Sequence, residues 1–488
     1  MRRFLPTPIV AALLTVSLLL LAGAAFWLLP ASVFTTARVI TAQELPAFYT
    51  GGLAQGTGGK LEQNWDAYDQ KNLFTPSQAR NAQNALMPQN AYATPDACGS
   101  CHVSIHKNWQ QSLHSKSTTD SLYLKVKDLF VFERGAPAVR LCAGCHAPVA
   151  LMTGEVGLYN KESVSSQAGV SCGFCHSLES VHGGNGAYIS QPARVRAYWG
   201  GDYLKDPTLG LSAGDTFSKF LVNAKPEAHA ADMRPAALLS GQVCQSCHQF
   251  SINGVAVQST WAEWQASSYP AQGQTCTSCH FRSSSDYIKL EPGEVVPGRW
   301  RKHLLGHLLP GGSTITAARA AQNVDYLRDS LGLSATFELG RLLVSVANLK
   351  AGHSIPTGVA DLRQLWLEVL AYSSAGQVLY SSGTTDLAGE IKPSSTGGSS
   401  VIFHQVLADA RGFALKRHDI WSAAKIVEDT RIAANSTRKA EFRLPVGVAK
   451  IAVRLLWRDI PASFAQMVLN QSGSSVPVRV LHQWNWKQ

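Results

Sequence analysis

The sequence predicts a multidomain protein with one N-terminal transmembrane helix, a mostly α-helical domain with little sheet, and a C-terminal antiparallel β-sandwich. Three observations lead to this prediction. Residues 9–29 form an apolar run, a short cysteine motif recurs five times between residues 98 and 280, and the residues after 335 alternate between apolar and polar types. A chain of 488 residues also exceeds the ~250–300 residues at which single cores stop growing.

The apolar run 9–29 is long enough to cross a bilayer, because about 20 helical residues span a ~30 Å hydrocarbon layer. Two arginines precede the run and no basic residue directly follows it, so the positive-inside rule places the rest of the chain outside the cytoplasm. We therefore predict that residues 1–30 are an uncleaved membrane anchor. The alternative is a signal peptide cleaved near Ala22-Gly23-Ala24, but the apolar residues continue beyond that point.

Composition divides the remaining chain into three segments. Residues 31–93 are polar and rich in Gly, Gln and Asn, so we predict a tether there. Residues 94–332 carry the cysteine motifs between short helix-like pieces and turns, and they form the predicted helical domain. Residues 335–488 contain no cysteine and form the predicted β-sandwich domain.

All ten cysteines belong to five copies of the motif Cys-x-x-Cys-His. This is the attachment signature of c-type haem, in which two thioethers fix the porphyrin and the histidine becomes an axial iron ligand. Disulfides usually staple separate positions, and a zinc ribbon needs neither a histidine after every pair nor an odd number of pairs. The predicted attachment cysteines are Cys98, Cys101, Cys142, Cys145, Cys172, Cys175, Cys244, Cys247, Cys276 and Cys279.

The predicted cofactors are therefore five covalently bound haem c groups. Haem c is attached on the far side of the bacterial inner membrane, so we expect a single-pass protein of that membrane with the haem and β domains in the periplasm. The predicted proximal iron ligands are His102, His146, His176, His248 and His280.

Strand patterns mark the second half of the chain. A helix-like stretch runs from Ser313 to about Leu331 and opens on a Ser that can cap its N-terminus. Apolar residues then alternate with others from Leu342 to Val346 and again from Leu365 to Ala371, which is typical of half-buried strands. Ser373–Gly376 reads as a hairpin turn.

The sequence around the motifs resembles the multihaem cytochromes c related to the tetrahaem cytochrome c of ammonia oxidation and to hydroxylamine oxidoreductase. The C-terminal half resembles a β-domain found fused to such haem domains. The resemblance covers residues from about 95 to the end. It rests on Trp109, Ser112 and His114 after the first motif, GVSCGFCH at Cys172, GQTCTSCH at Cys276, the segment from Val346 to Gly358, and Asp429-Thr430-Arg431-Ile432.

The resemblance implies two distal ligands. The histidine after the Trp-x-x-Ser segment ligates a neighbouring haem in such proteins, and by position this is His114. His229, upstream of the fourth motif, occupies the place of another ligand histidine.

Position in the sequence suggests four further candidates for distal iron ligands. His303 and His307 are four residues apart and share one helical face, so at least one is a predicted ligand. His182 lies on a Gly-rich turn after its motif. His353 precedes Pro356-Thr357-Gly358 and either ligates a haem across the domain interface or belongs to a structural turn.

Three histidines lie within β-domain sequence, and we interpret them as structural. His106 is four residues after the first proximal histidine, on the same helical face, and contacts a haem or solvent instead of ligating iron. Met152 and Met233 are interpreted as packing groups. The structural β-domain histidines are His404, His418 and His482.

The formal net charge of +10 does not indicate nucleic-acid binding. No run of five basic residues occurs, and the propionates of five haems would add roughly −10. We expect no nucleic-acid partner.

The function that these observations predict is electron relay. Haem iron with two histidine ligands has no free position for substrate, so five such haems favour electron transfer over substrate conversion. The expected partners are a quinol-linked donor or soluble cytochrome, and a terminal reductase or second cytochrome. The alternative is a multihaem oxidoreductase in which one haem is open to a small nitrogen or sulfur compound. The absence of a Cys-x-x-Cys-Lys motif, which pentahaem nitrite reductases use at the catalytic haem, disfavours that alternative.

Overall fold

The computed structural model describes most of the chain from residue 73 onward. No helix within the described ranges is long and apolar enough to cross a membrane. The predicted span 9–29 and most of the predicted tether lie outside the described residues. The described ranges are 73–82, 84–87, 91–156, 163–192, 223–224, 226–281, 293–296, 299–301, 304–311 and 317–488.

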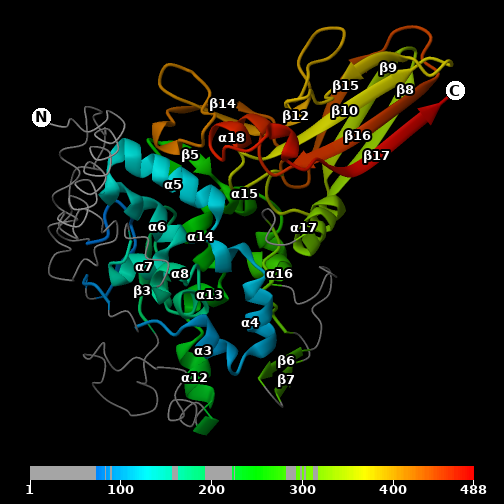
Figure 1. Ribbon diagram of the computed structural model, residues 1–488. Helices are drawn as coiled ribbons and strands as arrows, with labels where there is room; N and C mark the ends of the chain where they lie inside the picture. The colour runs from blue at the N-terminus through cyan, green and yellow to red at the C-terminus, as the bar shows by residue number, and fades with distance from the viewer. Residues whose placement is uncertain are drawn as a thin grey trace, which may run out of the picture.

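The first half of the described chain is built from short helices (Figure 1). The longest of these helices, α5, begins after Asp120, whose carboxylate accepts a hydrogen bond from the Tyr123 backbone N–H, and ends at Gly135 with φ of 85°. The helices are α3 (Pro95–Gly99), α4 (Val103–Gln110), α5 (Ser121–Arg134), α6 (Arg140–His146), α7 (Pro148–Thr153), α8 (Val164–Gln167), α9 (Cys172–Cys175), α12 (Pro226–Asp232), α13 (Ala236–Leu239), α14 (Gln242–His248), α15 (Thr260–Gln265) and α16 (Cys276–His280).

Sheet in this half is limited to short strands. They form one three-stranded sheet in the order β1-β3-β2 and the hairpins β4-β5 and β6-β7. A compact apolar core that includes Phe74, Leu151, Phe174 and Tyr188 lies at one side of the helices. The strands are β1 (Arg80–Asn81), β2 (Leu178–Val181), β3 (Tyr188–Ser190), β4 (Phe250–Ile252), β5 (Val255–Gln258), β6 (Gly293–Val296) and β7 (Arg299–Arg301).

The helix α17 (Ala317–Ser330) leads directly into the strand β8 (Leu331–Glu338). The helix lies within the segment predicted for it. The strand β8 was not predicted, and it begins inside the range 94–332 that was assigned to the helical domain. Its signal was present in the sequence, because apolar residues occupy every second position from Leu331 to Phe337.

The C-terminal half contains antiparallel sheets, as predicted. One has the order β15-β9-β8, another has the order β11-β10-β16-β17 with β12 also pairing with β10, and β13 and β14 form a hairpin. The strands are β9 (Arg341–Asn348), β10 (Gln364–Tyr372), β11 (Val378–Ser382), β12 (Ile402–Phe403), β13 (Gln405–Ala408), β14 (Lys425–Asp429), β15 (Thr437–Arg443), β16 (Lys450–Arg458) and β17 (Arg479–Lys487).

The two larger sheets share one apolar core. Val344 of β9 pairs with Ala440, and Val369 of β10 pairs with Val453, so both sheets turn every second residue toward this core. The alternation predicted for β9 and β10 is confirmed, and the residues involved are fully buried: Leu342, Val344, Val346, Leu365, Leu367, Val369 and Ala371.

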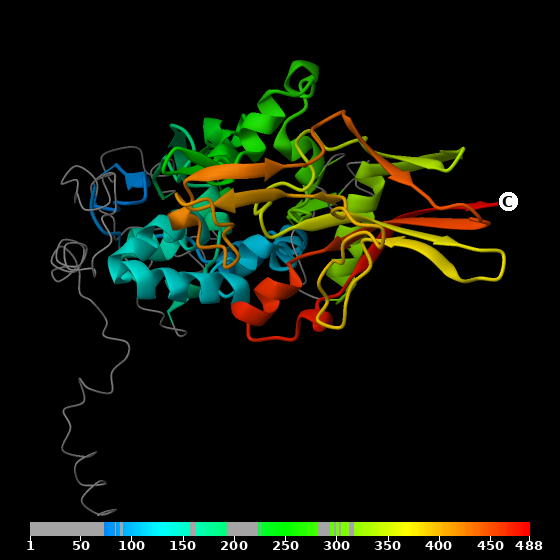
Figure 2. The ribbon, with the colours of Figure 1, turned by 90° about the horizontal axis from the view of Figure 1, so that it is seen from above.

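The β13–β14 hairpin lies over the helical half in both views, while the larger sheets extend away from it (Figures 1 and 2). A third apolar cluster joins the two halves there. Phe130 of α5 contacts Trp421 with ring centroids 4.6 Å apart, and Val257 and Leu407 belong to the same cluster. The C-terminal half therefore covers part of the helical half, next to α5.

Candidate haem-binding site

Each Cys-x-x-Cys-His motif lies on or beside a short helical turn. In a helix, residues three and four positions apart share one face, so both cysteines and the histidine of a motif point to the same side. Caps fix these turns: the Ser171 hydroxyl accepts a hydrogen bond from the Phe174 N–H before α9, and Thr275 and Ser278 form a capping box at α16. We number the sites 1 to 5 by the first cysteine of each motif: Cys98, Cys142, Cys172, Cys244 and Cys276.

One cavity of about 1870 Å³ contains all five sites. All ten cysteines line it, none is in a disulfide, and eleven histidines also line it. Apolar walls with thiols and imidazoles are the donor set that covalent haem c requires. The residues present therefore fit this cofactor.

The sites are neighbours in space although they are spread along the chain. Three pairs of thiols lie within hydrogen-bonding reach, and each pair joins two different sites. These contacts connect site 1 to site 3, site 2 to site 4, and site 4 to site 5. The pairs are Cys98 and Cys172, Cys145 and Cys247, and Cys244 and Cys276.

Four of the five proximal histidines face a second histidine. Two iron–nitrogen bonds of about 2 Å, with the imidazole rings on either side, place ring centroids roughly 6 Å apart. The observed centroid separations agree with this spacing. They are 6.2 Å for His102 and His229, 6.3 Å for His248 and His114, 6.4 Å for His176 and His307, and 6.2 Å for His280 and His353.

Hydrogen bonds orient these imidazoles. At site 1, the Nδ1 of His102 lies 2.9 Å from the Val295 carbonyl oxygen, which leaves Nε2 for a metal. Metal-ligating histidines usually bond their second nitrogen in this way. Backbone carbonyls contact Nδ1 of four further paired histidines, namely His176, His280, His307 and His353.

Burial keeps most of the paired histidines neutral. It lowers the pKa of His114, His248, His280 and His307 to about 4. A neutral imidazole has a lone pair for iron, whereas a protonated one does not. At neutral pH these side chains are therefore in the state that ligation requires.

Site 2 differs from the other four. The ring of His146 stacks on Tyr123 at 4.5 Å and 9°, which is too close for a metal between the rings. Among the described residues, no histidine ring faces His146 at the separation of the other pairs. His418 of the C-terminal half lines the same cavity.

The structure places the remaining candidates as follows. His182 is outside the cavity on its turn, with Nε2 3.1 Å from the Ser180 hydroxyl. His106 lines the cavity but stacks on Trp109. His303 lies outside the described residues.

Other residues interpreted as structural have protein partners. Met152 is buried in the apolar core, and the backbone carbonyl oxygen of Met233 contacts Nδ1 of His176. His404 faces Glu428, and His482 contacts the Arg328 carbonyl oxygen. His418 was interpreted as structural because its neighbours in the sequence give no haem motif, but it lines the cavity.

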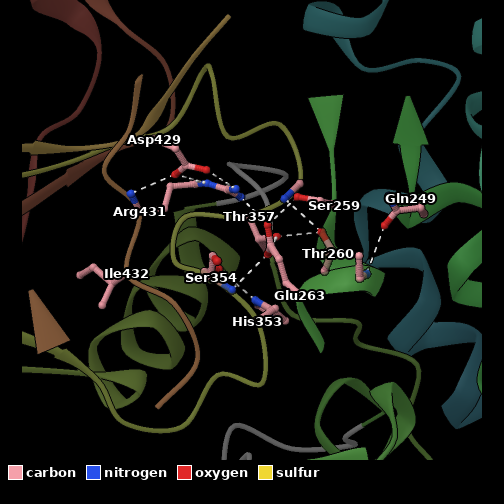
Figure 3. A network of polar contacts seen from close by, with 12 residues as sticks. Gln249, Ser259, Thr260, Glu263, His353, Ser354, Thr357, Asp429, Arg431 and Ile432 are labelled. Atoms are coloured by element: carbon pink, nitrogen blue, oxygen red, sulfur yellow. Dashed lines mark hydrogen bonds and ion pairs between the residues drawn. The ribbon is translucent and has the colours of Figure 1, made fainter. Parts of the chain in front are cut away.

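A buried ionic network holds the turn that carries His353 (Figure 3). Glu263 of α15 accepts hydrogen bonds from the Ser354 N–H at 3.1 Å and from the Thr357 hydroxyl at 3.0 Å. Arg431 bridges Glu263 at 2.6 Å and Asp429 at 2.7 Å. The network thus ties a helix next to site 4 to the β-domain turn whose His353 faces His280 of site 5.

Comparison with known proteins supports this description. Residues 97–177 match the family described as "Cytochrome c554 and c-prime". The crystal structure of a penta-heme cytochrome c552 from Thermochromatium tepidum is similar with a TM-score of 0.55 and 20% identity, over 82% of this chain and 100% of that chain. No curated protein matches. The family match and the structural similarity support a multihaem c-type cytochrome with covalently bound haem c, and the resemblance to hydroxylamine oxidoreductase stays a prediction.

Proposed function

We propose that this protein is a membrane-anchored periplasmic pentahaem c-type cytochrome that relays electrons between redox partners. The observation that carries the proposal is the set of four histidine pairs with ring centroids 6.2–6.4 Å apart. Haem with two histidine ligands exchanges electrons without binding substrate, and this is the chemistry that the cofactor supplies when bound.

The residues of this chain position the cofactor and tune its surroundings. Buried neutral imidazoles provide ligands, and carbonyl contacts to Nδ1 fix their rings. Apolar cavity walls limit solvent access, which is one of the main determinants of haem potential. The thiol contacts place site 1 next to site 3, and sites 2 and 5 next to site 4, so haems attached there would be close enough to exchange electrons.

A haem count and a reduction experiment test the relay. A pyridine haemochrome assay should give five haems per chain. In stopped flow with a donor that reacts at one surface site, all five should be reduced in the same phase, because transfer between neighbouring sites outpaces entry. Fewer than five haems, or haems that are reduced independently, would contradict the proposal.

The donor and acceptor follow from the proposed location. We expect a quinol-linked or soluble donor, and a terminal reductase or second cytochrome as acceptor. Adding a quinol to membranes that contain the oxidised protein should produce the absorbance change of reduced haem c. A soluble ferrous cytochrome should do so instead if the donor is soluble.

A second candidate function rests on site 2. His146 faces Tyr123 and no described histidine at the paired separation, so the bound haem could keep one position open. The protein would then be an oxidoreductase for a small nitrogen or sulfur compound. Electron paramagnetic resonance of the ferric protein should show one high-spin haem whose signal changes on adding hydroxylamine or nitrite. Five low-spin haems would exclude this candidate.

A further inference from the structure

His418 is oriented in the way that a functional histidine usually is. Its Nδ1 lies 2.7 Å from Oδ2 of Asp361, whose side chain is only 3% exposed. The other carboxylate oxygen of Asp361 is buried without a hydrogen-bond partner among the described residues. Because Nδ1 donates to the carboxylate, Nε2 carries the lone pair of neutral His418.

The backbone holds His418 in an unusual conformation. Its φ is +56°, which a non-glycine residue rarely adopts and which often occurs at functional positions. Residues on both sides of His418 bond to Glu133 of α5: Arg417 donates to one carboxylate oxygen at 3.0 Å, and the Trp421 indole N–H donates to the other at 2.8 Å. The loop therefore presents His418 next to the helix that covers site 2.

His418 lines the cavity that contains site 2. His146, Tyr123 and His418 all line it, as does Phe130, which packs on Trp421. Leu141 and Cys142 of site 2 pack against the apolar cluster that contains Phe130 and Trp421, so the loop that carries His418 lies beside site 2 and its His146. Yet their rings are not a pair at the 6.2–6.4 Å separation seen at the other sites.

We propose that Asp361 and His418 form the distal wall of a small-ligand site at site 2, with His418 as a base that does not ligate iron. The site would take small neutral molecules that carry an acidic proton, such as hydrogen sulfide. On binding, the ligand gives its proton to Nε2 of His418 while the Nδ1–H remains bonded to Asp361, and no electron is transferred in this step. This proposal rests on the second candidate function and names its acid–base group.

Hydrogen cyanide is the probe, because it is a weak acid that loses its proton when it binds ferric haem. The full-length ferric holoprotein is mixed with cyanide in stopped flow, and spin state is measured in parallel. We expect one high-spin haem in the wild type and in His418→Gln. Cyanide association should slow by about 10²-fold in His418→Gln and by a smaller factor in Asp361→Asn. His404→Gln, a β-domain histidine outside the cavity, is the control and should bind at the wild-type rate.

Two results would overturn the proposal. If the wild type has only low-spin haem and His418→Gln creates a high-spin one, His418 is an axial ligand. If one haem is high-spin but His418→Gln binds cyanide at the wild-type rate, the histidine is not the base, although the open haem remains. A haem count and circular dichroism on each variant establish that it is folded. The relay function is measured separately by the reduction phase of all five haems.

Discussion

Single residues decide which side chain faces each proximal histidine, and His114 is the clearest case. It lies 6.3 Å from His248 between ring centroids, although the two are far apart in the sequence. His182, another candidate ligand from the sequence, contacts the Ser180 hydroxyl outside the cavity.

Replacement of His114 should therefore change one iron. We expect His114→Ala to convert the haem of site 4 from low to high spin, because the variant lacks a nitrogen on the distal side. His182→Ala is the matched control and should keep the wild-type electron paramagnetic resonance spectrum. A high-spin signal in the control, with none in His114→Ala, would reverse the assignment.

Histidine protonation also makes stability depend on pH. Burial lowers the pKa of His280 to about 4 from the usual value of 6.5. Between these values the unfolded chain binds a proton that the folded protein does not, so stability is complete above about pH 6.5 and declines as the pH falls toward 4.

The measurement is the unfolding midpoint of the holoprotein in denaturant from pH 7.5 to 4. We expect the midpoint to fall steadily below pH 6.5. A midpoint that rises on acidification would show that the histidines are protonated in the folded protein.

At the level of elements, the turn that carries His353 is held by a buried network of Glu263, Arg431 and Asp429. These residues are far from the turn in the sequence. Arg431 is 8% exposed and bonds both Glu263 and Asp429. Removing one partner of a buried ion pair leaves an uncompensated charge and typically costs 3–5 kcal/mol. The exposed pair of Arg341 and Glu441 in the same half gives a comparison, because surface pairs contribute only about 0–1 kcal/mol.

We therefore expect Arg431→Ala to lower the free energy of unfolding by about 3 kcal/mol and to alter the low-spin signal of site 5, whose proposed distal ligand is His353. Arg341→Ala should change stability by less than about 1 kcal/mol and leave the spectrum unchanged. Thermal unfolding and electron paramagnetic resonance measure both effects. Equal losses in the two variants would indicate that the network does not position His353.

At the level of the whole molecule, attachment to the membrane is the main expectation that stays a prediction. We expect that replacing residues 1–30 with a cleavable export signal yields a soluble periplasmic protein with five haems. The unchanged chain should require detergent for extraction. N-terminal sequencing distinguishes the alternative, because a wild-type protein that begins after Ala24 has lost a signal peptide.

Much of the architecture was predictable because its causes are local. The helical half and the antiparallel sheets follow from periodicity, and residues such as Val344 and Val369 are buried as their alternation indicates. The strand β8 was missed although its alternation was visible. The contact of the β13–β14 hairpin with α5 was not predictable, because it depends on Phe130 and Trp421 meeting across a large sequence separation.

The sequence by itself determined the five attachment motifs and their proximal histidines, because thioether bonding needs two cysteines and a histidine within five consecutive residues. Only the tertiary structure decided which histidine stands opposite each of them. The distal partners come from other helices and, for His353, from the C-terminal half, so no local pattern encodes the pairing. The same reason applies to His418. It becomes a candidate site residue only because folding places it next to Asp361 and in the wall of the cavity.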